Sequence, residues 1–289
     1  MKIVDELLFF TIKIWVKVNN TFHDLIGIKF IGIGFLLRKL TIDRIFECKG
    51  FKFFLNHNVS GCYAVMVGNL WNEPETHKFF KQIFTRIEGP IHFIDVGANI
   101  GEMVIDVAHY SSSGRIIAFE PVAECAQACY ESAQLNSFVI EVRNKALSKN
   151  KGMLSFNIDS TNQNASGICY DSSNNKASIE ASTLDHETTD LSGNIVVLID
   201  IEGAELDVVK GGREFIQRIK PLIIFEYNQV SKQYFTLSSM SQELGDDYLI
   251  YRLRSRDGLL DNHLDETWNC VAVNKCSSFY SLCSGLMAE

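Results

Sequence analysis

The segment of this chain best suited to chemistry joins an apolar strand-like run to a turn that contains glycine. It reads His92-Phe-Ile-Asp-Val-Gly-Ala-Asn-Ile-Gly-Glu102, and the apolar run ends at Asp95. Gly97 has no side chain, so a ligand can approach the backbone there, and a helix that starts near Gly101 offers free backbone N–H groups. Ligands of open α/β sheets bind at the carboxyl ends of the strands. The segment therefore predicts a cofactor loop.

The spacing of the glycines favours one nucleotide cofactor over another. A dinucleotide site reads G-x-G-x-x-G, whereas three residues separate Gly97 from Gly101 here, with Asn99 in the middle. A carboxylate at the turn, Asp95, suits a cofactor with a sulfonium and an ammonium group better than it suits a diphosphate. S-adenosylmethionine is therefore favoured over NAD, and a nicotinamide-dependent oxidoreductase is disfavoured.

A second acid follows the next strand-like run, in Ala118-Phe-Glu-Pro121. Glu120 stands where an acid can accept hydrogen bonds from ribose hydroxyls. Asp95 or Glu120 alone could instead cap the helix that follows its strand, whatever the function. The pair in this order favours methyl transfer.

Two later strand-like runs also end in acids, Asp200 and Glu226. We expect both at the same sheet edge as Asp95. In an O-methylation the acceptor hydroxyl must lose its proton, and a positioned carboxylate can take it as a general base. Asp200 is the first candidate for this catalytic role and Glu226 the second.

Glu202 and Glu205 have two competing interpretations. Acids at a helix start stabilise the helix dipole in any protein. With Asp200 they could alternatively hold a divalent cation through oxygen ligands. Because the sequence offers no clear fourth ligand, we predict no metal.

Strand-like and helix-like runs alternate from about residue 74 onward, which predicts an α/β fold with an open, mostly parallel sheet and helices on both faces. The last two strands could form an antiparallel edge. Strands are expected at 91–96, 115–119, 139–146, 195–199, 222–225, 248–253 and 268–273, with short strands within 152–184, and helices at 74–87, 101–110, 122–135 and 204–219.

Several of these motifs, in this order, resemble the FkbM family of methyltransferases over about residues 75–275. The resemblance implies a class I (Rossmann-like) fold that uses S-adenosylmethionine to methylate a hydroxyl of a sugar, polyketide or similar metabolite. The motifs are 95–101 (Asp-Val-Gly-Ala-Asn-Ile-Gly), 118–121 (Ala-Phe-Glu-Pro), Asn136, 146–148 (Ala-Leu-Ser), 183–185 (Thr-Leu-Asp) and 200–205 (Asp-Ile-Glu-Gly-Ala-Glu).

The resemblance also implies roles for single residues. Glu120 would hold the ribose, and Asp200 would lie nearest the methyl group. The family commonly has Lys two residues before the Asp of the fourth-strand motif, where this chain has Leu198. The cofactor loop would comprise Asp95, Gly97, Ala98, Asn99 and Gly101.

Residues 1–70 lie outside these motifs and are predicted as an N-terminal extension to a methyltransferase domain at 71–289. Apolar residues recur at helical spacing up to Val18, Asn19-Asn20-Thr21 then breaks the pattern, and a second helix could continue to Leu40. This indicates a helical hairpin, followed by short strands between Ile45 and Gly68 with a turn at Lys49-Gly50.

The charge distribution bears on the partners. The 289 residues carry a formal net charge of −8, which argues against nucleic acid as the partner, and the fourth-strand motif is not the Asp-Pro-Pro-Tyr type of DNA and RNA amino-methylation. Residues 1–40 have six Lys or Arg and three Asp or Glu, a net of +3. The extension could lie on an anionic membrane, or cover the sheet or a dimer partner.

The remaining features are typical of a cytoplasmic protein. None of the eight cysteines forms a C-x-x-C pair, no secretory signal is visible, and Phe30–Leu37 is too short an apolar run to span a membrane. The sequence therefore predicts a methyltransferase that acts on a small-molecule or glycan hydroxyl. The alternative is a non-catalytic protein that keeps the fold for partner or membrane-surface binding, which has no need for Asp95, Glu120 and Asp200 together.

Overall fold

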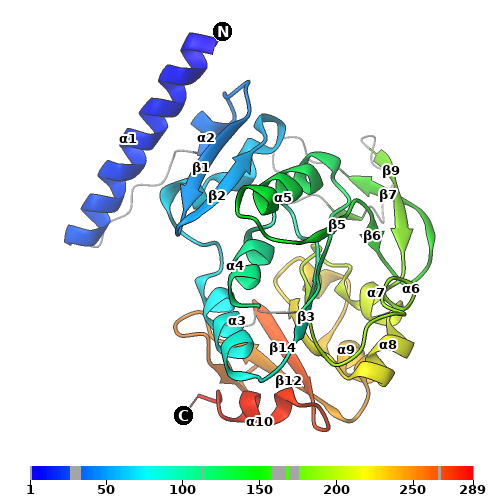
Figure 1. Ribbon diagram of the computed structural model, residues 1–289. Helices are drawn as coiled ribbons and strands as arrows, with labels where there is room; N and C mark the ends of the chain where they lie inside the picture. Colours follow the sequence, from blue (N-terminus) through cyan, green and yellow to red (C-terminus); the bar gives the residue numbers. More distant parts are fainter. Residues whose placement is uncertain are drawn as a thin grey trace.

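The computed structural model describes residues 2–26, 34–111, 114–157, 167–168, 176–265 and 268–288. Its centre is a sheet with the strand order β13-β12-β14-β11-β10-β3-β4-β5 (Figure 1). The strands are β3 (Ile91–Val96), β4 (Ile116–Phe119), β5 (Glu141–Arg143), β10 (Asn194–Ile199), β11 (Leu222–Glu226), β12 (Tyr248–Leu253), β13 (Leu260–Asp261) and β14 (Asn269–Asn274). The five strands from β5 to β11 are parallel, and β14 runs antiparallel to both β11 and β12. The predicted sheet and its antiparallel edge are confirmed.

Both faces of the sheet are covered, which is why its central strands are apolar throughout. Phe93 and Leu198 belong to one hydrophobic cluster, whereas their neighbours Ile94 and Val197 belong to another on the opposite face. The first cluster includes side chains of α3 (Pro74–Arg86), α4 (Glu102–Tyr110), α5 (Ala123–Leu135) and α10 (Phe279–Ser284). The second includes side chains of α6 (Leu184–Glu187), α7 (Glu205–Lys210), α8 (Arg213–Ile219) and α9 (Leu237–Leu244).

Two predicted elements are each divided in the structure. The strand expected at 139–146 ends at Arg143, and Ala146 begins a second sheet. The helix expected at 204–219 is interrupted at Gly211, where an added Cβ would lie 2.1 Å from the Ser148 carbonyl oxygen. The second sheet has the order β6-β9-β7-β8, with β6 (Ala146–Leu147), β7 (Gly152–Asn157), β8 (Gly167–Ile168) and β9 (Lys176–Ser182).

The N-terminal part begins with α1 (Lys2–Ile26), which projects from one side of the molecule (Figure 1). The break predicted at Asn19-Asn20-Thr21 is wrong, because the helix runs through it and the Thr21 hydroxyl donates to the Lys17 carbonyl, 2.9 Å away. Residues 27–33 of the predicted second helix lie outside the described residues. The structure continues with α2 (Gly34–Leu37), β1 (Arg44–Cys48), β2 (Phe51–Leu55), η1 (His57–Tyr63) and η2 (Met66–Gly68).

Short strands were predicted as far as Gly68, but this prediction is wrong after Leu55, because the chain forms short 3₁₀ turns at His57–Tyr63 and Met66–Gly68. Tyr63 is fully buried, and its hydroxyl donates to the Phe54 carbonyl at 2.8 Å, so this ring anchors the turns beneath the β1–β2 hairpin. The hairpin in turn rests on α5, where the Phe54 N–H donates to Ser132 Oγ at 3.0 Å. Within the described residues, no helix combines the length and apolarity that a membrane span requires.

A cavity at the carboxyl ends of the strands

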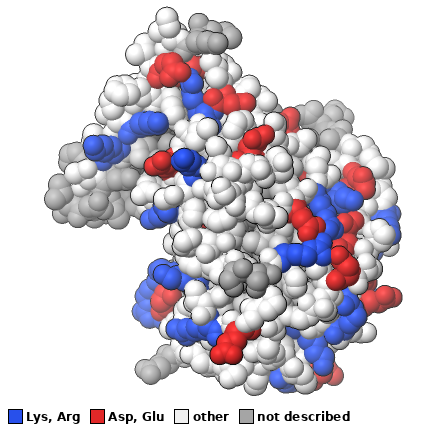
Figure 2. Space-filling view, in the orientation of Figure 1, with Lys and Arg blue, Asp and Glu red and all other residues white. Residues whose placement is uncertain are grey.

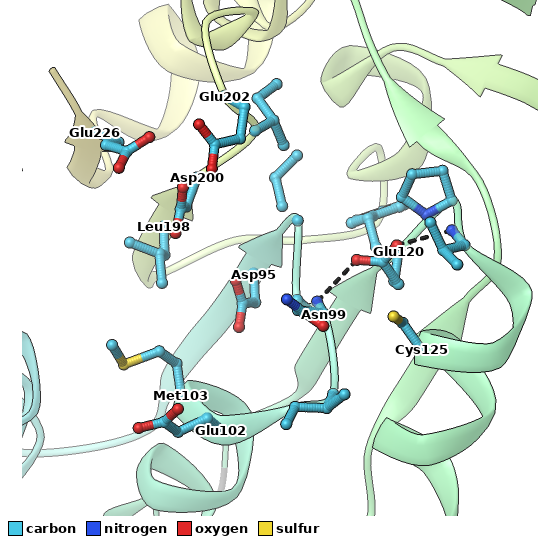
Figure 3. A pocket seen from close by; sticks show the side chains of 18 of the residues that line it. Asp95, Asn99, Glu102, Met103, Glu120, Cys125, Leu198, Asp200, Glu202 and Glu226 are labelled. Carbon is cyan, nitrogen blue, oxygen red and sulfur yellow. Dashed lines mark hydrogen bonds between the residues drawn. The ribbon is translucent and has the colours of Figure 1, made fainter. Parts of the chain in front are cut away.

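A cavity of about 300 Å³ opens where β3, β4, β10 and β11 end. Of the predicted site residues, Gly101 alone does not line it. The side chains come from four strand ends and face a common space (Figure 3). The predicted residues that line the cavity are Asp95, Gly97, Ala98, Asn99, Glu120, Asp200 and Glu226.

The loop between β3 and α4 is held from two sides. The N–H groups of Gly97 and Ala98 both donate to the Phe119 carbonyl at the end of β4, at 2.9 and 3.1 Å. Gly97 has a φ of +91°, and an added Cβ would lie 1.9 Å from the Asp200 carbonyl oxygen. A glycine is therefore required for the loop to pass the end of β10, and its backbone stays open to the cavity.

Gly101 does not line the cavity, and the structure shows a packing contact for it. It precedes α4 with a φ of +85°, and an added Cβ would lie 2.6 Å from Cys129 Sγ. The glycine thus lets α4 pack closely on α5. Its effect on the cofactor loop is to fix the start of the helix.

Glu120 ties the loop to the next helix. Its Oε2 accepts the Asn99 N–H at 2.8 Å, and its Oε1 accepts the Val122 N–H at 2.7 Å, directly before α5. Burial raises the pKa of Glu120 to about 7, and the two hydrogen bonds oppose that rise. The carboxylate therefore caps a helix and faces the cavity as well, and each of its oxygens has a second lone pair for a ligand.

Asp95 lies deeper, at the end of β3, between Leu198 and Asn99 (Figure 3). It is 2% exposed. Burial, and then the charges of Glu120 and Glu73, raise its pKa to about 8. A cation placed beside Asp95 would relieve this and favour the charged carboxylate.

Asp200 and Glu226 face the same end of the cavity, as expected. Burial, and then the charges of Glu202, Glu205 and Glu73, raise the pKa of Glu226 to about 8. Burial and the Glu226 charge also raise the pKa of Asp200 well above its usual range. Each is thus a stronger base than an exposed carboxylate, as a general base for a hydroxyl requires.

Glu202 and Glu205, for which a helix-start role and a metal-binding role were both considered, lie in different surroundings. Glu205 Oε1 accepts the N–H groups of Gly203 and Ile201, at 3.0 and 3.3 Å, so it stabilises the turn that starts α7. Glu202 lines the cavity instead. Within the described ranges, no three His, Cys, Asp or Glu side chains are grouped so that they could hold a metal ion.

Sequence reasoning missed several lining residues, Glu73, Glu102 and Trp268 among them. Glu73 directly precedes the Pro74 that opens α3, and its Oε2 accepts the Asn269 side-chain amide at 2.7 Å. The helix start at Pro74 was visible in the sequence. Its approach to the strand ends depends on tertiary packing, which no local pattern showed.

A buried ion network supports Glu102 at the edge of the cavity. His77 Nε2 lies 3.3 Å from Glu102 Oε1, and its Nδ1 lies 2.7 Å from Asp106 Oδ2. The Trp71 ring stacks on His77, with centroids 4.4 Å apart. Although burial opposes it, the two carboxylates raise the pKa of His77, so this histidine favours its charged form between them.

Comparison with known proteins identifies the region that supplies most of the cavity lining. Residues 95–251 match the family described as "Methyltransferase FkbM domain", which is more than half of the chain. No curated protein matches the chain.

Solved structures of similar shape include an FkbM methyltransferase from Methylobacillus flagellatus KT, with 18% identity and a TM-score of 0.44 over 75% of this chain. This chain spans 55% of that protein's length. A ribosomal-protein methylase from Lactobacillus delbrueckii subsp. bulgaricus has 15% identity and a TM-score of 0.39, over 71% of this chain and 80% of its own.

Proposed function

Because the chain belongs to the FkbM family of methyltransferases, we propose that it binds S-adenosylmethionine in this cavity and methylates a hydroxyl of a sugar, glycan or other small metabolite. The observation that carries the proposal is the placement of Asp95, Glu120 and Asp200 at three strand ends around the open backbone of Gly97. We also propose that the protein is cytoplasmic.

The chemistry of these residues suits the cofactor. Buried carboxylates with raised pKa values favour a cationic ligand, and S-adenosylmethionine carries a sulfonium and an ammonium group. The free lone pairs of Glu120 suit the ribose hydroxyls. When bound, the cofactor would supply an electrophilic methyl group, and Asp95, Gly97, Ala98 and Asn99 would form its cradle, with Gly101 fixing the helix start behind them.

Asp200 and Glu226 supply the base. While the acceptor oxygen takes up the methyl group that the bound cofactor would supply, its hydroxyl proton would move to a carboxylate oxygen. Asp200 is the first candidate, and Glu226 can act in its place. Such general-base assistance contributes about 10²–10⁴-fold to a rate.

The test is a calorimetric titration of the purified protein with S-adenosylhomocysteine, with NAD as the control ligand. We expect one defined site for S-adenosylhomocysteine and none for NAD. Glu120→Ala should weaken binding at least about tenfold because it removes an ionic acceptor. The exposed Glu88→Ala serves as the matched control and should leave binding unchanged.

No binding of S-adenosylhomocysteine by a folded sample would overturn the proposal. The alternative, a protein that keeps the fold for partner or membrane-surface binding, would then account for the chain better.

A further inference from the structure

The end of the cavity that contains Asp200 is strongly acidic. Lys145 is the single Lys, Arg or His among the described residues that line the cavity, and its ammonium lies 3.3 Å from Glu180 and 3.4 Å from Glu187. The Lys145 ammonium is therefore already paired with two acids that do not line the cavity. The acids that line the cavity are Glu73, Asp95, Glu102, Glu120, Asp200, Glu202 and Glu226.

One of these acids has an unused oxygen. Glu226 is 4% exposed and lines the cavity, and its Oε2 has no hydrogen-bond partner within the described residues. A buried carboxylate oxygen without a partner is costly. A ligand that donates a hydrogen bond into this end of the cavity would remove that cost.

An aromatic residue, Trp268, lines the same cavity, and its side chain hydrogen-bonds Glu73. Trp268 is 55% exposed, and its carbonyl is fixed by the Tyr227 N–H at 2.7 Å. It directly precedes Asn269, which pairs with Glu226 in the sheet register. An indole face next to carboxylates is a favourable surface for an organic cation.

We infer that the acceptor is a hydroxy compound that also carries a protonated amine, and that Glu226 and Trp268 bind its ammonium group. This rests on the proposed function, because it names the acceptor class of the same cavity. Phosphorylated or carboxylated acceptors are disfavoured, since they would bring a negative charge among Glu73, Asp200 and Glu202. With Glu226 on the ammonium group, Asp200 is left as the base for the hydroxyl.

The experiment measures binding of three matched probes, glucosamine, glucose and glucose 6-phosphate, to protein saturated with S-adenosylhomocysteine at constant ionic strength. We expect glucosamine to bind at least tenfold more tightly than glucose, and glucose 6-phosphate more weakly than either. Glu226→Gln should remove the advantage of the amine. Leu198→Lys should reverse the order, because it adds a cation beside Asp200.

Each outcome decides the inference. Equal binding of the three probes, tighter binding of the phosphate, or an amine advantage that persists in Glu226→Gln would overturn it. If S-adenosylhomocysteine itself binds, such a result leaves the proposed function standing. If S-adenosylhomocysteine does not bind, the proposed function fails first.

A different observation concerns α1, which is apolar on two opposite sides. Phe9 and Ile12 are buried against the rest of the molecule. At 3.6 residues per turn, five further apolar residues form a stripe on the opposite side. They are Ile3, Leu7, Phe10, Ile14 and Val18, which are 76%, 62%, 62%, 48% and 50% exposed.

The charges around this stripe are mainly basic. On the helix, Lys13 and Lys17 lie toward one edge of the stripe, and the Lys13 ammonium is 4.7 Å from the centroid of the Phe9 ring. The exposed Glu6 is paired with Arg44 at 2.9 Å. Figure 2 shows the projecting α1 region as a largely uncharged surface with separate charged groups.

We propose that α1 lies flat on an anionic lipid surface, with the stripe in the acyl region and Lys13 and Lys17 at the phosphate level. The apolar stripe would supply the affinity and the lysines the preference for negative lipid.

The test is co-sedimentation with vesicles of phosphatidylcholine alone or with 30% phosphatidylglycerol. We expect binding to the anionic vesicles, at least tenfold weaker binding to the neutral ones, and loss of binding in the double variant Leu7→Ser/Phe10→Ser. Ile45→Ser, a 50% exposed residue of β1 outside the stripe, is the control. No binding to anionic vesicles, or a dimer in ultracentrifugation that the double variant abolishes, would overturn the proposal.

Discussion

The cavity and helix α1 depart from ordinary protein surfaces in opposite directions. At the cavity, ionisable groups are buried, with Asp95 2% and Glu226 4% exposed, whereas along α1 the apolar Leu7 and Phe10 are each 62% exposed. Both arrangements raise the free energy of the protein without a partner, because burying a charge and exposing apolar surface to water are each unfavourable. In each region a partner of the matching chemistry would remove the cost.

The backbones of the two regions differ as well. In the cavity loop every second residue from Gly97 to Gly101 has a positive φ, namely Gly97, Asn99 and Gly101. The N–H groups of Gly97 and Ala98 are held by the Phe119 carbonyl of the neighbouring strand. Helix α1 is a regular helix, and the proposed lipid contact requires only that its apolar stripe is exposed. Site chemistry therefore depends on single backbone positions, and the α1 surface on the sum of several side chains.

The largest effect should come from Gly97→Ala. The added Cβ would overlap the Asp200 carbonyl, and the φ of +91° strains any other residue, so we expect a loss of about 3 kcal/mol in unfolding free energy. Binding of S-adenosylhomocysteine should become undetectable. Urea unfolding and calorimetry measure the two effects.

Gly193→Ala is the matched control for that variant. Its φ is +85°, but an added Cβ meets nothing within 4 Å. It should cost about 1–2 kcal/mol from the backbone conformation alone and leave binding intact. Equal behaviour of the two variants would show that the close approach at Asp200 is not what shapes the loop.

A pair of substitutions on α1 tests its two sides. Ile12 is fully buried, so Ile12→Ala should lower the unfolding free energy by about 2–4 kcal/mol. Ile14 is 48% exposed on the other side, and Ile14→Ala should change it by less than about 0.5 kcal/mol. Denaturant unfolding of both variants gives the comparison, and similar losses would mean that the stripe is packed in solution.

These contrasts also show what the sequence could predict. The strands β3, β10 and β11 are apolar on both faces, so they were visible as runs, and an acid after each strand placed Asp95, Asp200 and Glu226 at one edge. The fold and the acids at the strand ends follow from such local patterns and from the rule for parallel sheets.

The rest depends on contacts between distant segments. Glu73 approaches the cavity through the packing of α3, and Gly101 serves the contact with Cys129 on another helix. Propensity alone predicted a helix end at Asn19-Asn20-Thr21, because these residues favour caps. The Thr21 hydroxyl bonds within the helix instead, and local sequence does not separate these two outcomes.

The buried acids predict a pH dependence that the α1 surface should not share. The folded pKa values of Asp95, Glu120 and Glu226 are about 8, 7 and 8, above the usual values near 4. Between these limits the folded chain binds more protons than the unfolded chain, so stability falls as pH rises. The raised pKa of His77 acts in the same direction.

We expect the Tm of the ligand-free protein to fall by at least about 4 °C between pH 5.5 and 8.5. The three carboxyls together are worth more than about 2 kcal/mol, and about 1 kcal/mol shifts the Tm of a chain of this size by about 2 °C. Asp95→Asn should reduce the slope, and Phe10→Ser should leave it unchanged. Scanning calorimetry across the pH range measures this. A Tm that stays constant or rises would contradict the burial of charge at the cavity.

A smaller loss of stability is expected at the contact between α5 and the β1–β2 hairpin. Asn136, at the end of α5, accepts the Lys52 N–H at 3.0 Å and donates to the carbonyls of Lys52 and Ser132, both at 2.7 Å. Asn136→Ala should therefore lower the unfolding free energy by about 1–2 kcal/mol. Asn136→Asp keeps the acceptor but loses both donors, so it should be no more stable than the alanine variant.

Because side chains of β2 and β3 belong to one hydrophobic cluster, fluorescence and circular dichroism should report the same single unfolding transition in both variants. A separate early transition would show that the N-terminal region unfolds on its own, and that the cost of its exposed stripe is then independent of the cavity.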